Sequence, residues 1–231
     1  MSQSRRGKSP GGRQLSVRVK TARGRKTSST RWLQRQLNDP YVAEARRAGY
    51  RSRAAWKLAQ IDDRFGFLGP GARVVDLGAA PGGWTQVAVE RVGAGKPGGG
   101  QVVGVDILAM EPIDGAELMR LDMTDADAGD RIRAALGGPV DVVLSDMAAS
   151  TIGHRATDLL RTIVLCDAAA YFACDVLAEG GAFVTKVFQG GAEGDLLSVL
   201  KQRFASVRHF KPAASRDESP ETYLVATGFR G

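Results

Sequence analysis

The sequence has few of the residues that build metal centres and disulfide frameworks: its 231 residues include two cysteines and two histidines. Cys166 and Cys174 lie in an apolar, alanine-rich stretch where helical spacing predicts ordinary core positions. His154 and His209 are far apart in the sequence. A zinc site needs clustered Cys or His ligands, and two cysteines provide no disulfide framework. We therefore expect no metal ion.

Long apolar runs are absent as well. No stretch approaches the roughly 20 apolar residues that a helix needs to cross a bilayer, so we expect no membrane contact. The apolar content of 43% allows one sizeable domain and hardly two at this length. The composition therefore predicts a soluble domain of enzyme size.

Acidic residues are missing from residues 1–38, which hold 11 of the 32 Lys and Arg residues and none of the 25 acidic ones. Residues 39–231 therefore carry 21 basic and 25 acidic side chains, so the tail accounts for the net charge of +7. Its Ser-, Gly- and Arg-rich composition buries too little apolar surface to fold alone. We expect a disordered tail that contacts RNA phosphates; a solubility tail and a mitochondrial presequence are the alternatives.

The most informative segment is DLGAAPGGW at residues 76–84, which follows an apolar run. A strand that ends in an acid, turns through glycines and enters a helix forms the ligand crevice of doubly wound α/β folds. The dinucleotide fingerprint requires Gly-x-Gly-x-x-Gly, whereas here three residues separate Gly78 from Gly82. A tight turn without a pyrophosphate cradle favours S-adenosylmethionine, which has no phosphate. A glycine loop that only turns a strand into a helix is the alternative.

From residue 39 onward the pattern alternates helix and strand, which predicts one α/β domain over residues 39–231 with helices on both faces of a mostly parallel sheet. Its last two strands have no helix between them and predict a terminal hairpin. Helices are expected at 40–48, 52–65, 85–92, 125–136, 157–177 and 193–204. Strands are expected at 72–77, 101–107, 117–121, 140–145, 182–187, 206–210 and 223–228.

Polar residues end four successive predicted strands. Parallel sheets bind ligands at the carboxyl ends of their strands, which makes Asp106, Asp122, Asp146 and Lys186 candidate site residues. Asp106 could accept hydrogen bonds from the ribose hydroxyls of an adenosine, and Asp122 from an adenine amino group. If the last strand is antiparallel, its first residues lie at the same edge, so Glu221 joins the set.

Lys57, on the helix before the first strand, could close this site from the side. A solvated lysine on a helix surface is the alternative.

These residues carry a resemblance to the FtsJ/RrmJ (RlmE) family of ribosomal RNA ribose 2'-O-methyltransferases. It covers roughly residues 30 to 231 and rests on the motifs at residues 50–58, 76–84, 145–148, 186–190 and 221–228. The family fold is a Rossmann-like, seven-stranded sheet with the last strand antiparallel. The resemblance implies a catalytic tetrad of Lys57, Asp146, Lys186 and Glu221. It implies that Gly82, Trp84, Asp106, Asp122 and Asp146 bind S-adenosylmethionine, and we add Gly78, at the turn of the glycine motif, to the expected cofactor contacts.

The resemblance further implies a cytoplasmic bacterial enzyme, expected to be monomeric, that methylates one uridine ribose in the A-loop of large-subunit ribosomal RNA, in the assembled or assembling subunit. Lys186 would either act as base, if burial and the charge of Lys57 favour its neutral form, or stay charged and steer the hydroxyl oxygen. The same reaction on tRNA or an mRNA cap is the alternative. Cytosine C5 methylation needs a cysteine nucleophile near a strand end and is disfavoured because both cysteines lie in mid-helix. A non-catalytic RNA-binding protein is disfavoured because the predicted strands end in polar residues.

Overall fold

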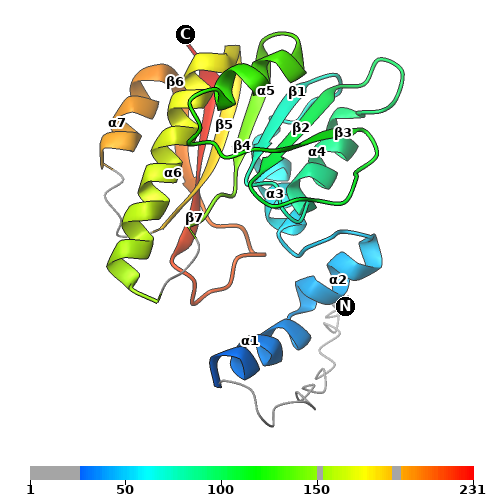
Figure 1. Ribbon diagram of the computed structural model, residues 1–231, viewed down its shortest axis with the longest axis vertical. Coiled ribbons are helices and arrows are strands. Elements are labelled where there is room, and N and C mark those ends of the chain that lie inside the picture. The colour runs from blue at the N-terminus through cyan, green and yellow to red at the C-terminus, as the bar shows by residue number, and fades with distance from the viewer. Residues whose placement is uncertain (1–26, 150–152, 189–193) are drawn as a thin grey trace, which may run out of the picture. The chain divides into compact units, whose positions relative to one another are not determined.

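The computed structural model describes residues 27–149, 153–188 and 194–231 (Figure 1). By their internal contacts the described residues form two units, residues 27–43 and Glu44–Gly231. The helices are α1 (Thr27–Leu37), α2 (Pro40–Ala48), α3 (Ala55–Phe65), α4 (Gly83–Val92), α5 (Ala128–Leu136), α6 (Arg155–Val176) and α7 (Gly194–Arg203). The strands are β1 (Arg73–Leu77), β2 (Gln101–Asp106), β3 (Ala116–Arg120), β4 (Val140–Ser145), β5 (Leu177–Phe188), β6 (Phe204–Phe210) and β7 (Glu221–Phe229).

The strands of the second unit form one sheet in the order β3-β2-β1-β4-β5-β7-β6. Strands β1 to β5 pair in parallel, whereas β7 pairs antiparallel with both β5 and β6. The predicted seven-stranded Rossmann-like sheet and its terminal hairpin are confirmed. Because β7 runs against its neighbours, its first residue, Glu221, pairs with Phe188 at the end of β5.

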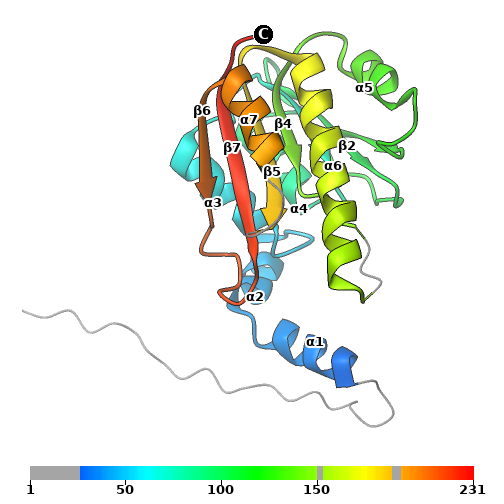
Figure 2. The same ribbon diagram turned by 90° about the vertical axis from the view of Figure 1, so that its left-hand side faces the viewer.

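Two apolar clusters cover the two faces of the sheet. Helices α3 and α4 pack on one face around Leu58, Ile61 and Trp84, and helices α5, α6 and α7 pack on the other around Ile132 and Phe183. Figure 2 shows α3 and α6 on opposite sides of the strands. Side chains alternate between the faces of a strand, so each strand residue belongs to one helical layer.

This alternation determines where the β5 lysine points. Phe183 and Val187 belong to the cluster under α5, α6 and α7, whereas Val184 belongs to the cluster under α3 and α4. Lys186, two residues after Val184, therefore points toward the layer that contains α3. That layer also carries Lys57.

Most predicted elements are present with ends that differ by a few residues. Helix α3 begins at Ala55, and not at residue 52, because its N-cap is Ala54 and the hydroxyl of Ser52 makes no capping bond. The largest difference is α1, which lies within the segment expected to lack structure. Its sequence contains Trp32, Leu33 and Leu37 but no Gly or Pro, and both of these helix breakers occur before residue 27.

The division of the chain after residue 38, which falls between α1 and α2, stays a prediction. Residues 1–26 of the expected tail lie outside the described residues.

Candidate active site

A lysine–carboxylate pair joins the ends of two neighbouring parallel strands, β4 and β5. Lys186 Nζ lies 2.6 Å from the main-chain oxygen of Asp146 and 3.1 Å from its Oδ1. The Lys186 side chain is 8% exposed and that of Asp146 is 20% exposed. A buried ammonium is unfavourable unless a counter-charge and hydrogen bonds compensate it, and Asp146 supplies both.

A second pair lies beside the first and joins α3 to β7. Lys57 Nζ is 2.6 Å from Oε1 of Glu221, and both side chains are largely buried. The prediction that the reversed last strand brings Glu221 to this edge is therefore correct in geometry. The predicted solvated alternative for Lys57 is wrong, because its ammonium is held in the ion pair.

Tyr223 connects the two pairs. It faces Lys186 in the antiparallel register of β5 and β7, so the two side chains emerge on the same face of the sheet. Its hydroxyl donates to Oδ1 of Asp146 at 3.0 Å, and Lys57 Nζ lies 5.9 Å from the centre of its ring. The two lysines, two carboxylates and one phenol form one polar network inside the α3 layer.

The charges of the network fix its protonation. Burial alone would raise the pKa of Asp146, but the ammonium groups of Lys186 and Lys57 and the hydrogen bonds from Lys186 and Tyr223 lower it below its usual value. Burial, with the negative charges of Asp146 and Glu221, raises the pKa of Tyr223 well above that of a free phenol. Asp146 is therefore an acceptor and Tyr223 a donor at neutral pH.

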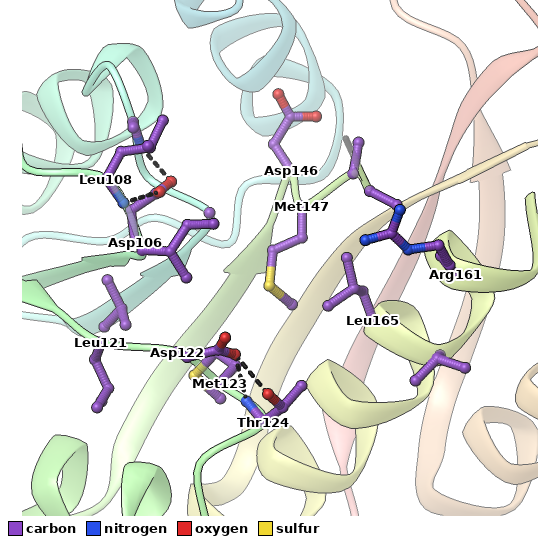
Figure 3. Close-up of a pocket in the computed structure, with 17 residues that line it drawn as sticks. Asp106, Leu108, Leu121, Asp122, Met123, Thr124, Asp146, Met147, Arg161 and Leu165 are labelled. Atoms are coloured by element: carbon purple, nitrogen blue, oxygen red, sulfur yellow. Dashed lines mark hydrogen bonds between the residues drawn. The ribbon is translucent and has the colours of Figure 1, made fainter. Parts of the chain in front are cut away.

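A cavity of about 630 Å³ lies at the carboxyl edge of the sheet. It is formed by the turns after β1, β2, β3 and β4 and by one face of α6, and Figure 3 shows its main side chains. Its described lining residues are Gly78, Ala80, Val105, Asp106, Ile107, Leu108, Leu121, Asp122, Met123, Thr124, Asp146, Met147, Ala148, Ala149, Arg161, Val164 and Leu165. Of the four residues in the predicted tetrad, Asp146 is the one that these include.

The acids of the cavity are held by neighbouring main chain. Asp106 accepts from the N–H of Ala80 through Oδ2 at 2.9 Å and from the N–H of Leu108 through Oδ1 at 2.8 Å (Figure 3). The N–H and the hydroxyl of Thr124 donate to Oδ1 of Asp122 and lower the pKa of that carboxyl. Each carboxylate can accept about four hydrogen bonds, so both can still accept from hydroxyl or amino groups of a ligand.

The first glycine of the motif lies against the cavity floor. Gly78 has φ +76°, and a Cβ there would stand 2.7 Å from Cγ of Met147. The turn after β1 and the residue after Asp146 therefore approach each other as only a glycine permits.

The second half of the glycine motif faces protein and not the cavity. A Cβ on Gly83 would stand 2.3 Å from Oγ of Ser52, and one on Gly82 would meet Ile113 and Arg51. The indole of Trp84 is buried and donates to the main-chain oxygen of Ala54. Gly82 and Trp84 are thus absent from the described cavity lining, and their predicted cofactor contacts stay predictions.

The lining residues also indicate which ligand suits the cavity. It carries three carboxylates and one guanidinium, that of Arg161, so acids outnumber bases and a phosphate is disfavoured. Apolar walls for a ring and acids for hydroxyl, amino and cationic groups fit S-adenosylmethionine better than a dinucleotide. Among the described residues, no three His, Cys, Asp or Glu side chains come together as a metal site.

Three polar residues of this region have no site role in the sequence analysis. Tyr223 stands in an otherwise apolar strand pattern, Ser215 lies in the loop before β7, and Asp76 is the acid of the glycine motif, with no further role assigned to it. Only the residue type of Asp76, an acid inside an apolar strand, is a signal that the sequence carries. Asp76 is fully buried, accepts from the hydroxyl of Thr85 at 2.7 Å, and has no described partner for Oδ1.

The sheet order, the antiparallel last strand and a cavity lined by acids at the strand ends are those of a Rossmann-like methyltransferase. A family model described as "FtsJ-like methyltransferase" matches residues 50–229. The match spans well over half of the chain, so the chain belongs to the FtsJ-like methyltransferase family.

Several curated proteins are similar over nearly the whole chain. They include proteins named "Ribosomal RNA large subunit methyltransferase E". The one from Paramagnetospirillum magneticum is 65% identical and covers 97% of this chain and 93% of its own length. The one from Roseobacter denitrificans is 64% identical and covers 95% of this chain and 93% of its own length. The one from Rhodospirillum rubrum is 61% identical and covers 98% of this chain and 86% of its own length.

A solved structure of similar fold comes from Plasmodium falciparum and is titled as a putative ribosomal RNA methyltransferase. It matches with a TM-score of 0.69 and 28% identity, covering 79% of this chain and all of that chain. No described helix has the length and apolar character to span a bilayer.

Asp76 generates a prediction about stability and pH. Burial, with smaller contributions from the charges of Asp146 and Asp106, raises its pKa to about 7, although the Thr85 hydroxyl opposes the shift. A group whose pKa is higher in the folded state contributes stability at low pH and loses it as pH rises through the folded value. Between about pH 4 and pH 7, wild type should therefore lose stability that an Asp76→Asn variant keeps.

The difference in unfolding free energy between Asp76→Asn and wild type should grow over this range by on the order of 4 kcal/mol, since one pKa unit corresponds to about 1.4 kcal/mol. Urea unfolding followed by tryptophan fluorescence at pH 4, 5, 6, 7 and 8 measures it. A difference that is constant from pH 4 to pH 8 would show that Asp76 ionises alike in both states.

Proposed function

We propose that the protein transfers a methyl group from S-adenosylmethionine to the 2'-oxygen of a uridine ribose in the A-loop of large-subunit ribosomal RNA, in the assembled or assembling subunit. The names of the similar proteins support the large ribosomal subunit RNA as substrate. The uridine and the A-loop follow from the family resemblance.

The observation that carries the proposal is the position of Asp146. Asp146 lines the cavity and is also the partner of Lys186 and Tyr223. A methyl donor in the cavity and a hydroxyl beside Lys186 would therefore meet at one carboxylate. Methyl transfer needs this kind of placement, because most of the rate comes from holding nucleophile and methyl group in line.

The cavity residues would hold the donor. We assign Asp106 to the ribose hydroxyls of its adenosine and Asp122 to the adenine amino group, since both are hydrogen-bond acceptors at adjoining strand ends. Asp146 would lie near the cationic sulfur. When bound, S-adenosylmethionine supplies a methyl group on a positive sulfur that leaves as a neutral thioether. The structure provides no metal-binding cluster among its described residues, and the proposed reaction uses no metal.

Lys186 would orient the attacking hydroxyl. Its two bonds to Asp146 occupy two of the three ammonium protons, and the third can be donated to the 2'-oxygen, which directs a lone pair toward the methyl group. In this steering role the hydroxyl proton would leave to water as the oxygen–carbon bond forms and the carbon–sulfur bond breaks. Alternatively, Lys186 first releases a proton to water and then, as a neutral amine, accepts the proton of the hydroxyl. Lys57 and Glu221, joined to Asp146 through Tyr223, would keep this arrangement in place.

The cofactor assignment is tested by Asp106→Ala. Losing hydrogen bonds to a charged acceptor should weaken S-adenosylmethionine binding by about 1 to 3 kcal/mol, while NAD should bind neither protein. Isothermal titration calorimetry gives both affinities. Asp114→Ala is the control, because Asp114 is exposed on the same β2–β3 connection and does not line the described cavity. Equal affinities of wild type and Asp106→Ala would remove Asp106 from the site.

The catalytic assignment is tested by Lys186→Met, which removes the ammonium and keeps most of the side-chain volume. Single-turnover methyl transfer should fall at least about 10²-fold, the lower range for a positioned acid–base group, with cofactor affinity nearly unchanged. Quench-flow with tritiated methyl donor and undermethylated large subunits measures the rate. A rate like that of wild type would refute the role of Lys186.

Lys186→Arg separates the two roles of the lysine. An arginine stays protonated and can steer an oxygen, but it cannot take up a proton. If Lys186 steers, this variant should retain more activity than Lys186→Met; if Lys186 is the base, both variants should lose activity equally.

We also propose that the basic tail of residues 1–38 binds RNA, chiefly through residues 1–26, and that the enzyme acts as a cytoplasmic monomer. The curated relatives named above are bacterial and give no support to a mitochondrial presequence. The tail carries nine Lys and Arg residues between Arg5 and Lys26 and no acid, whereas the rest is formally acidic.

Replacing these nine residues by glutamine should weaken RNA binding and flatten its salt dependence, by roughly 0.7 in the log–log slope for each ion pair with a phosphate that is removed. The methyl-transfer rate at saturating RNA should change little, because no proposed catalytic residue lies in the tail. Fluorescence anisotropy between 50 and 200 mM salt measures the slope. A variant with its residues 1–26 shuffled is the control, and a slope unaffected by the glutamines would make the tail a solubility or targeting element.

The alternative function is the same reaction on tRNA or an mRNA cap. The charged network would act on any ribose hydroxyl equally, so it does not distinguish these RNAs. They must be compared directly as substrates. Methyl incorporation into large subunits, free ribosomal RNA, tRNA and capped RNA, measured side by side, decides among them.

A further inference from the structure

The loop between β6 and β7, residues 211–220, carries a buried hydroxyl that contacts the charged network. Ser215 is 4% exposed, and its Oγ lies 2.8 Å from Oε1 of Glu221. Lys57 Nζ lies 2.6 Å from that same oxygen. One carboxylate oxygen of Glu221 therefore accepts both a serine hydroxyl and a lysine ammonium, which fixes the rotation of the carboxylate more tightly than either donor alone.

Helix α3 and the residues just before it hold this loop in place. The amide N–H of Ala214 donates to Oε1 of Gln60 at 2.8 Å, and Arg53 donates to the main-chain oxygen of Ala214. Arg53, Lys57 and Gln60 are spaced by four and three residues, so they lie on one face of the helical path. The face that presents Lys57 to Glu221 also binds the residue before Ser215.

The loop is closed by bonds of its own. Lys211 Nζ donates to the main-chain oxygens of Asp217 at 3.0 Å and Ser219 at 2.8 Å, and the N–H of Ser215 donates to the oxygen of Pro212 at 2.8 Å. These bonds hold the loop in a compact turn with Ser215 directed inward. A serine in a surface loop can remain exposed to solvent. The burial of Ser215 against Glu221 therefore indicates that its hydroxyl serves the charged network.

We propose that Ser215 is a positioning residue of the active site, which orients Glu221 so that Glu221 holds Lys57 beside the ribose-binding position. The inference deepens the proposed function and rests on it where the ribose is concerned. Ser215 touches neither reacting atom; it acts through the Glu221 carboxylate. Loss of its hydroxyl frees the carboxylate to rotate. This weakens the ion pair between Glu221 and Lys57 and leaves cofactor binding intact.

The first test needs no RNA and uses the full-length protein. Trace labelling with acetic anhydride, followed by mass spectrometry, gives the acetylation rate of Lys57 relative to the exposed Lys201. Ser215→Ala should raise this ratio at least about threefold over wild type, because an ammonium less firmly held is more open to acylation. Ser198→Ala, on the exposed side of α7, is the control and should leave the ratio unchanged.

The second test is a double-mutant cycle with Glu221→Ala, which detects coupling between residues that act as one unit. Ser215→Ala alone should slow single-turnover methyl transfer about 5- to 20-fold at saturating cofactor and RNA, with cofactor affinity within twofold of wild type. In the Glu221→Ala background, the same substitution should add less than a twofold effect on both the rate and the Lys57 ratio.

The outcomes separate this inference from the proposed function. Absence of methyl transfer by wild type would contradict the proposed function, while the labelling ratio would still decide the contact between Ser215 and the ion pair. An unchanged Lys57 ratio in Ser215→Ala would overturn the inference. The inference would also be overturned if the fold-loss in rate of the double variant equalled the product of the fold-losses of the two single variants, because Ser215 would then act independently of Glu221.

Discussion

The buried ammonium of Lys186 is the constraint on which the site depends. A lysine side chain that is 8% exposed needs a counter-charge within hydrogen-bond distance. Asp146 provides it because β4 and β5 are parallel neighbours whose ends lie side by side. Since Asp146 also lines the cavity, the requirement for charge compensation brings the two halves of the site together.

The reversed last strand adds the other half of the network. An antiparallel β7 puts Tyr223 opposite Lys186 and Glu221 at the carboxyl edge. The phenol of Tyr223 stays neutral because burial raises its pKa, and its hydroxyl donates to Asp146. Glu221 forms an ion pair with Lys57 of α3. A parallel β7 would have placed its first residue at the opposite edge. The polar network therefore follows from strand direction as much as from residue type.

The sequence predicts those site residues whose position follows from strand ends. Asp106, Asp122 and Asp146 lie at one edge because parallel strands share it, and Glu221 follows from the reversal of the hairpin. Tyr223 is not predicted, since an aromatic residue within a strand is typical of core. Gly82 and Trp84 turn toward the protein, Gly82 against Arg51 and Ile113 and the Trp84 indole against Ala54, which a linear motif does not show.

Other features depend on three-dimensional burial. The charge state of Asp76 is set by its complete enclosure and by two neighbouring acids, and no local pattern reveals these. The proposed role of Ser215 depends on a loop held by α3, which begins 160 residues earlier in the chain. Helix α1 is not predicted when composition is averaged over residues 1–38, although its own eleven residues lack Gly and Pro.

The central claim is that the paired lysines and carboxylates direct methyl transfer to a ribose oxygen. The most direct measurement is the chemical position of a tritiated methyl group placed on large-subunit RNA. A 2'-O-methyl group blocks alkaline cleavage of the adjoining phosphodiester, so the label should be recovered in an alkali-resistant dinucleotide containing uridine. Label recovered in a single nucleotide, as a methylated base, would contradict the account.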